Sequence, residues 1–277
     1  MEWSKAKNII IGMLIAVNIF LLFICFFAER NKRSVQETEI ANTVSYLQQH
    51  GTVIDPSIIP TQQEPRSILL IERDDVQEAQ LAETLIDGKR SDRTGGTVRF
   101  SADDGSKVAI WRAGGLFEAN TVIPDAFAYT GDLTAHPAVL KLAQAGAAAG
   151  EVREVDVGEH GKLLICQYHN GLPIFNATLT VTCGAEDIVY AAGRLCVGVS
   201  QPISAAEEMG VPGLLIRFAE QMADTDADLT HIKAIRPGYV AQNIVSTGVR
   251  LIPAWEITTP SGAYYINAVE GTMLVSE

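Results

Sequence analysis

Basic and aromatic residues are both scarce in this chain of 277 residues. Lysine and arginine number 21 against 33 aspartates and glutamates, the formal net charge is −12, and aromatic residues make up 7%. A nucleic acid would be repelled by most of such a surface, and no basic stripe with interleaved aromatics compensates for this. We therefore expect no nucleic acid among the partners.

Familiar catalytic and cofactor motifs are also missing. The patterns HExxH, GxSxG, GxGxxG and the Walker loop do not occur, and the five histidines show no paired zinc-ligand spacing. This predicts a protein that is not an enzyme, with no catalytic residue, no cofactor and no metal. A less favoured alternative is a cell-wall hydrolase using clustered carboxylates such as Asp103, Asp104 and Glu118.

Cysteine is rare, with four residues in the whole chain. Cys25 lies in an apolar run, and Cys166, Cys183 and Cys196 follow far apart, without CxxC spacing. All three later cysteines fall in strand-like runs, where a buried thiol behaves as a small apolar group. Whether two of them form a disulfide is left open by the sequence.

The scarcity of basic residues is uneven along the chain. Residues 1–33 contain five basic and two acidic residues, a net charge of +3, which leaves 16 basic and 31 acidic residues, a net charge of −15, for the remainder. With 47% hydrophobic residues, that acidic remainder has enough apolar material for a core. A short basic start therefore precedes a long acidic body.

Residues 8–28 contain no charge at all and are almost entirely apolar. About 20 apolar residues in a helix cover a hydrocarbon core about 30 Å thick, whereas a cleaved signal peptide has an apolar region of about 7–15 residues. We predict an uncleaved transmembrane anchor at 8–28. Residues 1–7 would be cytoplasmic and the large domain that follows would be extracellular, in a single-pass protein of the cell membrane.

Four residues of this segment are candidate contacts with a partner in the membrane. Gly12 and Ala16 form a small-xxx-small pair, and Trp3 would lie at the membrane interface. Asn18 lies near the middle of the span, where an amide is costly without a partner. It either bonds to another transmembrane helix or bonds to its own backbone.

The remaining chain predicts an α+β fold. Residues 29–55 form a juxtamembrane helix and linker, and two extracellular subdomains follow at 56–199 and 200–277, each a helix with antiparallel strands. A boundary near residue 135 would also divide the chain sensibly. One helix is expected after a cap at Asp74 or Asp75, with an apolar face from Val76 to Ile86 and an end at Gly88. Further helices are expected at 138–149 and from a capping box of Ser204 and Glu207 onward. Strands are expected in between, including 67–73 and a hairpin turning at Asp103-Asp104-Gly105.

Both ends of the chain carry motifs of a known family. The start MEWSKAK at 1–7, with Asn18 and the run FLL at 20–22, resembles the YycI (WalI) family. The finish, with IPAWEI at 252–257, YYINA at 264–268 and Gly271, resembles the last strands of that family and is also similar to PepSY-like modules. NGLPIFN at 170–176 matches a turn and strand of the same kind, whereas residues 90–150 carry no such motif.

The resemblance implies a bitopic regulator in Gram-positive bacteria. Such proteins act on the sensor histidine kinase of the YycFG (WalKR) two-component system, which controls cell-wall metabolism, together with the sister protein YycH. Membrane-span contacts with the kinase carry part of the signal, and no catalytic residues belong to the family. The alternative is a PepSY-like extracytoplasmic module that inhibits a protease or organises wall enzymes.

Overall fold

The computed structural model describes residues 2–61, 64–87, 90–144, 149–156, 162–205, 207–223, 225, 228–244 and 248–274. The helices are α1 (Glu2–Gln49), α2 (Asp75–Ile86), α3 (Pro137–Gln144) and α4 (Val211–Met222), with the short 3-10 helices η1 (Pro56–Ile58), η2 (Ala113–Gly115), η3 (Leu133–Ala135) and η4 (Ala185–Asp187). The strands are β1 (Val53–Ile54), β2 (Ser67–Glu72), β3 (Arg90–Thr94), β4 (Thr97–Ser101), β5 (Val108–Trp111), β6 (Leu116–Val122), β7 (Ala149–Asp156), β8 (Lys162–His169), β9 (Leu172–Cys183), β10 (Ile188–Arg194), β11 (Ser200–Ala205), β12 (His231–Ile232), β13 (Ala234–Ile244), β14 (Gly248–Thr259), β15 (Gly262–Asn267) and β16 (Met273–Leu274).

Most strands belong to one large mixed sheet. Its path runs β11-β2-β14-β13-β9-β10-β6-β5-β4-β3, while β15 and β16 extend from β14, and β8 and β7 extend from β9. Neighbouring strands in it are antiparallel, except that β13 and β9 meet in parallel at Tyr239 and Ile174. The predicted α+β fold class is confirmed.

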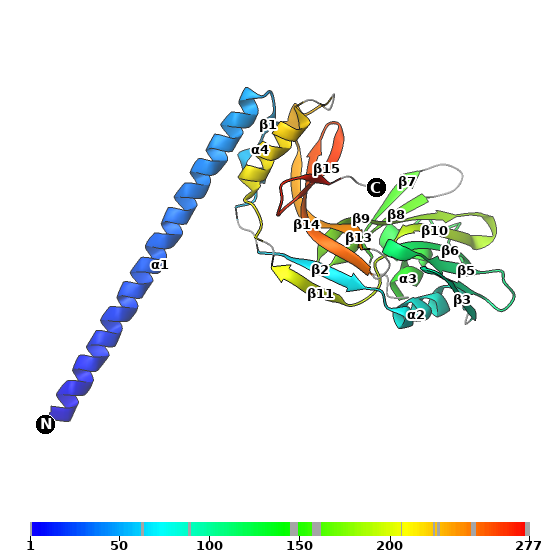
Figure 1. Cartoon of the computed structure of the whole chain (residues 1–277), viewed down its shortest axis with the longest axis horizontal. Helices are drawn as coiled ribbons and strands as arrows, with labels where there is room; N and C mark the ends of the chain where they lie inside the picture. The colour runs from blue at the N-terminus through cyan, green and yellow to red at the C-terminus, as the bar shows by residue number, and fades with distance from the viewer. Residues whose placement is uncertain are drawn as a thin grey trace.

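The two larger apolar clusters of the described residues lie under different helices, α2 and α3 in one and α4 with the end of α1 in the other (Figure 1). One contains α2 and α3 packed on β4, β5, β6, β9 and β10, with Trp111 and Phe117 fully buried. The other contains α4 and the end of α1 packed on β14 and β15, around Phe218 and Trp255. Strand β2 pairs with β14 and β11, so residues 67–72 join the sheet of the C-terminal part.

Helix α1 is one continuous helix that projects away from the sheet (Figure 1). Its predicted continuation from the apolar run into the following polar residues is confirmed. Among the residues described, no helix has both the length and the apolarity needed to cross a membrane. In the apolar run of α1, the side chains of 8–10, 25 and 27–28 are outside the described part of the structure. The transmembrane part of the predicted architecture is thus unsupported here and stays a prediction.

Two local predictions are wrong. The capping box at Ser204 does not start a helix: residues 200–205 are strand β11, and α4 begins at Val211 behind Gly210. The helix expected at 138–149 ends at Gln144, residues 145–148 lie outside the description, and Ala149 opens β7 opposite β8. In both places, pairing with a distant strand overrides a local helix preference.

Candidate functional site

The four predicted membrane-contact residues all lie in α1, but the structure does not bring them onto one face. Gly12 and Ala16 are one turn apart, whereas Asn18 follows Ala16 by two residues, which is about 200° around a helix. The position of Gly12 is open, because a Cβ built there would meet nothing within 4 Å. The side chain of Trp3 lies outside the description.

The Asn18 amide bonds within its own helix. Its Nδ2 donates to the carbonyl oxygen of Leu14 at 2.8 Å, the second of the two alternatives that the sequence allowed. The other end of this amide, Oδ1, has no hydrogen bond among the described residues of this single chain. A donor on a neighbouring helix would therefore find a vacant acceptor there.

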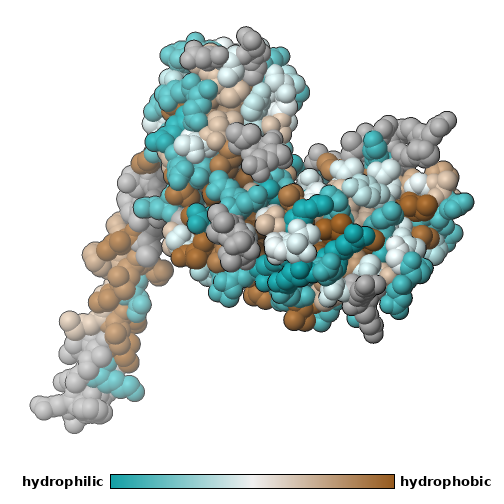
Figure 2. Space-filling model, turned by 45° about the vertical axis from the view of Figure 1, so that its right-hand side comes forward, coloured by the Kyte–Doolittle hydropathy of each residue, from teal (hydrophilic) through white to brown (hydrophobic). Residues whose placement is uncertain are grey.

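The end of α1 belongs to the C-terminal core. Thr43 and Leu47 are buried, at 2% and 0% exposure, and Leu47 packs in the same cluster as Leu214, Leu215 and Phe218 of α4. By contrast, large apolar side chains earlier in α1 are exposed, among them Ile11, Met13, Leu14, Ile15, Val17, Ile19, Phe20, Leu21, Leu22, Phe23, Ile24 and Phe26. Figure 2 shows this hydrophobic surface on the part of α1 that extends from the domain.

An open cleft of about 740 Å³ lies on the face of β11, β2, β14 and β13. Register places Leu69, Tyr239 and Trp255 on this same face. One wall is the segment before β2, and the other is the turn between β8 and β9. The lining residues are Pro60, Glu64, Pro65, Arg66, Ser67, Leu69, His169, Asn170, Leu172, Ser200, Pro202, Pro237, Tyr239 and Trp255.

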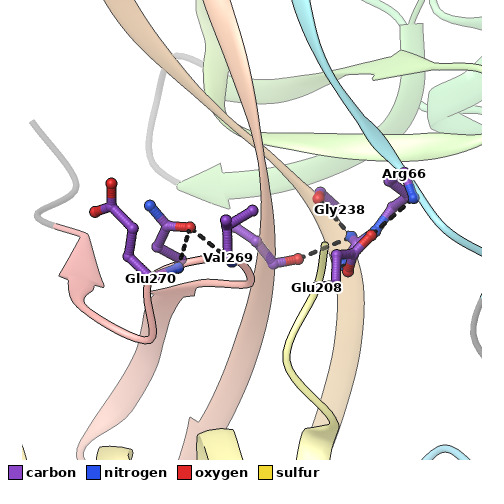
Figure 3. A network of polar contacts seen from close by, with 7 residues as sticks. Arg66, Glu208, Gly238, Val269 and Glu270 are labelled. Carbon is purple, nitrogen blue, oxygen red and sulfur yellow. Dashed lines mark hydrogen bonds and ion pairs between the residues drawn. The ribbon is translucent and has the colours of Figure 1, made fainter. Parts of the chain in front are cut away.

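Arg66 closes one end of the cleft through a buried ion pair with Glu208 (Figure 3). Its Nε and Nη2 donate to the two carboxylate oxygens at 3.1 and 2.6 Å, and its Nη1 donates to the carbonyl oxygens of Gly238 and Ala254. The guanidinium also lies over the ring of Trp255, 5.1 Å from its centre. The charge of Arg66 is therefore used within the fold.

Two titratable groups of the cleft, the imidazole of His169 and the phenol of Tyr239, are neutral. Burial lowers the pKa of the His169 imidazole and raises the pKa of the Tyr239 phenol, so neither is charged near pH 7. The two rings meet edge to face at 6.1 Å, and Nε2 of His169 lies 3.3 Å from the Ser200 hydroxyl. The cleft thus offers hydrogen-bonding groups without a free positive charge.

One polar atom of the cleft residues is buried without a partner. Trp255 is 2% exposed, and its indole Nε1 has no hydrogen-bond acceptor within the described part of the chain. The hydroxyl of Tyr239, a residue 6% exposed, also makes no hydrogen bond there. The Trp255 N–H is enclosed by the protein, whereas the Tyr239 hydroxyl lines the cleft and is a donor for an acceptor oxygen.

Side-chain bonds join the two halves of the sheet beside this cleft. Asn176 on β9 uses its whole amide on Ala241 of β13: Nδ2 donates to the carbonyl oxygen at 2.9 Å, and Oδ1 accepts from the backbone N–H at 2.7 Å. Arg194 donates to the same carbonyl oxygen. The Asn176 side chain therefore holds β9 against β13.

The C-terminal motif likewise builds a turn. Oδ1 of Asn267 accepts from the backbone N–H groups of Val269 and Glu270 at 2.9 and 3.2 Å (Figure 3), and the carbonyl oxygen of Ala268 accepts from Met209 at 2.8 Å. Gly271 has a φ of +67°, and a Cβ there would meet Arg217 at 2.6 Å. These residues position the start of α4.

The carboxylates considered for hydrolysis do not come together. Asp104 accepts from the backbone N–H and hydroxyl of Ser106 in the β4–β5 turn, and these bonds lower its pKa. Glu118 pairs with Arg112, which lowers the pKa of that carboxylate. Each holds local structure.

The outer cysteines do not form a reactive centre. Cys183 and Cys196 are buried thiols; burial raises the pKa of Cys183 and raises that of Cys196 to about 12, so both stay protonated. The Sγ of half-buried Cys166 lies 3.7 Å from the carbonyl oxygens of Gln167 and Ile174. No group of three or more metal-binding side chains gathers anywhere in the described ranges.

Most cleft residues were missed by sequence reasoning. Arg66, Glu208 and Tyr239 come from three distant segments, and nothing in their local patterns marks them. The sequence pointed to the cleft only indirectly, because Trp255 and the residues after Asn170 belong to the motifs that resemble the YycI family.

Comparison with known proteins gives no family. No protein-family model and no curated protein matches this chain. Among solved structures, it is similar to an uncharacterized protein from Eubacterium rectale, with 9% identity and a TM-score of 0.44 over 82% of this chain and 90% of that one.

Proposed function

We propose that this protein is a membrane-anchored regulator of a sensor histidine kinase of the YycFG type, which controls cell-wall metabolism. Residues 8–28 would cross the membrane, and the two subdomains at 56–199 and 200–277 would lie outside the cell. A YycH-like sister protein would bind beside it. The YycI-like motifs at both ends of the sequence support this proposal, and one structural observation carries it further.

That observation is the continuity of α1 from the apolar run into the domain core. About 35 residues separate Gly12 from Leu47, a distance of about 50 Å along a helix. Leu47 is fully buried among α4 residues, so α1 ends as part of the core. A shift or rotation of the anchor would therefore be transmitted through α1 to the core of the C-terminal part.

The exposed apolar surface of α1 supports an anchor that is covered in the cell. Its large side chains between Ile11 and Phe26 are each more than two-fifths exposed in the single chain. A patch of this kind marks contact with lipid or with another protein. A partner helix that favours one kinase state by about 1–3 kcal/mol would shift signalling several-fold.

Asn18 gives the sharpest test of the membrane contact. We expect Asn18→Leu to reduce co-purification of the full chain with the kinase or the sister protein, because the vacant Oδ1 would be lost. Val17→Leu, an apolar change at the neighbouring position, is the matched control and should leave recovery unchanged. Equal recovery of the partners with Asn18→Leu and with wild type would contradict this role.

The PepSY-like alternative has one observation in its favour, the Asn267–Gly271 turn that anchors α4. It predicts inhibition of an extracytoplasmic protease by this chain. Protease assays with the purified full chain would separate the two proposals, since the kinase regulator is expected to leave proteolysis unchanged.

A further inference from the structure

The cleft beside Tyr239 plays no part in the proposed membrane contact. We infer that this cleft binds an extended peptide segment of a partner protein, uncharged or basic, through the segment's backbone carbonyl oxygens. The inference depends on the cleft alone and holds whether or not the partner is a kinase.

The donors of the cleft call for an acceptor-rich ligand. The hydroxyl groups of Tyr239 and Ser67, two residues that line the cleft, make no hydrogen bond among the described residues. A ligand that displaces water from these hydroxyl groups has to offer acceptor atoms in its place. Peptide carbonyl oxygens would supply the missing acceptors.

The charges of the cleft exclude an anionic ligand. The charged side chains among its described lining residues are Glu64 and Arg66, and Arg66 is neutralised by Glu208. An anion would therefore meet no free positive charge and would lie near the exposed Glu64 carboxylate. A neutral or basic segment fits the charges of the cleft. The net negative charge of the chain also attracts a basic segment.

The shape and apolar lining favour a peptide over a sugar. Sugar sites use exposed aromatic faces, but Tyr239 and Trp255 are 6% and 2% exposed, and Arg66 covers the Trp255 ring. Leu69, Leu172 and four prolines (Pro60, Pro65, Pro202 and Pro237) line the cleft instead. These side chains suit apolar or proline residues of an extended segment.

The edge strand β11, next to the cleft, limits the ways in which a peptide can bind. Among the described strands, β11 is an edge of the sheet beside the cleft, but Pro202 has no N–H and the register shifts between Pro202 and Ser204. Such features hinder the addition of a further strand along a whole edge. The segment is therefore expected in the cleft, and exposed Val199 and Ile203 can contact residues that continue past it.

A peptide selection tests the inference. Full-length protein in lipid nanodiscs is used to select from a phage-displayed library of random dodecapeptides, and enriched peptides are measured by fluorescence anisotropy. Ser67→Trp, which fills the cleft, should weaken their binding at least tenfold, and Tyr239→Phe, which removes one donor, should weaken it several-fold. Thr180→Trp, on the exposed face of β9 away from the cleft, should leave affinity unchanged.

Three outcomes would overturn the inference, provided that thermal unfolding shows each variant folded. The first is a selection that enriches no peptide. The second is equal binding of enriched peptides to wild type and Ser67→Trp. The third is cleft-dependent binding of chitooligosaccharides in place of peptides, which would assign a sugar ligand.

Discussion

Arg66 and Glu208 lie 142 residues apart in the chain and form a two-pronged ion pair at 3.1 and 2.6 Å, with side chains 7% and 5% exposed. Glu208 also accepts the backbone N–H of Arg66 at 2.8 Å. The pair fixes the segment before β2 to the segment before α4. The pair thereby fixes the position of Arg66 at one end of the cleft.

Removal of one partner of this pair should destabilise the protein strongly. Glu208→Ala leaves a buried guanidinium without its counter-charge, and we expect a loss of about 3–5 kcal/mol in the free energy of unfolding. Urea unfolding of the detergent-solubilised chain, followed by tryptophan fluorescence, measures it. Arg112→Met breaks the Arg112–Glu118 pair, which is 40% and 38% exposed, and should cost less than about 1 kcal/mol. Similar losses for both variants would contradict the structural role of Arg66–Glu208.

Leu47 should couple α1 to the domain. Leu47→Ala opens a cavity at a fully buried position, and a loss of about 2–5 kcal/mol in the free energy of unfolding is expected. Val35→Ala, at a residue 50% exposed in the same helix, should change it by less than about 0.5 kcal/mol. Hydrogen exchange should also speed up in residues 40–49 of the Leu47 variant. Unchanged exchange there would show that α1 does not depend on this contact.

Stability should fall as the pH drops below about 6.5, because His136 is held neutral in the fold. Burial lowers its pKa, and its Nδ1 accepts the backbone N–H of Ala138 at 3.2 Å. Between the lowered folded pKa and the unfolded value near 6.5, the unfolded chain binds more protons, so stability rises with pH. The slope is at most about 1.4 kcal/mol per pH unit for one group.

Urea unfolding between pH 5 and 7.5 tests this pH dependence. His136→Asn keeps an acceptor for the Ala138 amide but cannot titrate, so its slope should be smaller than that of wild type. His169, whose pKa burial also lowers, should account for part of the remaining slope. An unaltered slope in the His136 variant would refute the assignment.

The elements that could be predicted are those whose cause lies within a few residues. Asp74, one of the two capping residues that the sequence allowed, caps α2 through its side chain, which accepts from the backbone N–H groups of Val76 and Gln77. Gly105 takes a φ of +73° in the predicted β4–β5 turn. Both depend on local backbone geometry, which neighbouring residues set.

The elements that escaped prediction depend on distant partners. Ser204 and Glu207 have the spacing of a capping box, but Ser204 lies in strand β11 because Ile68 of β2, 136 residues earlier, pairs with it. The same holds for Ala149, which pairs with Gln167. Local preferences of a fraction of a kcal/mol lose to a ladder of backbone hydrogen bonds.

The sequence by itself determined the charge-free run at 8–28, the acidic body and the α+β class, because composition and periodicity are properties of the chain alone. Tertiary structure decided that α1 ends in the core at Leu47, that Arg66 is neutralised by Glu208, and that Tyr239 and Trp255 share a cleft. These relationships require segments far apart in sequence to meet, and burial then changes what their polar groups can do.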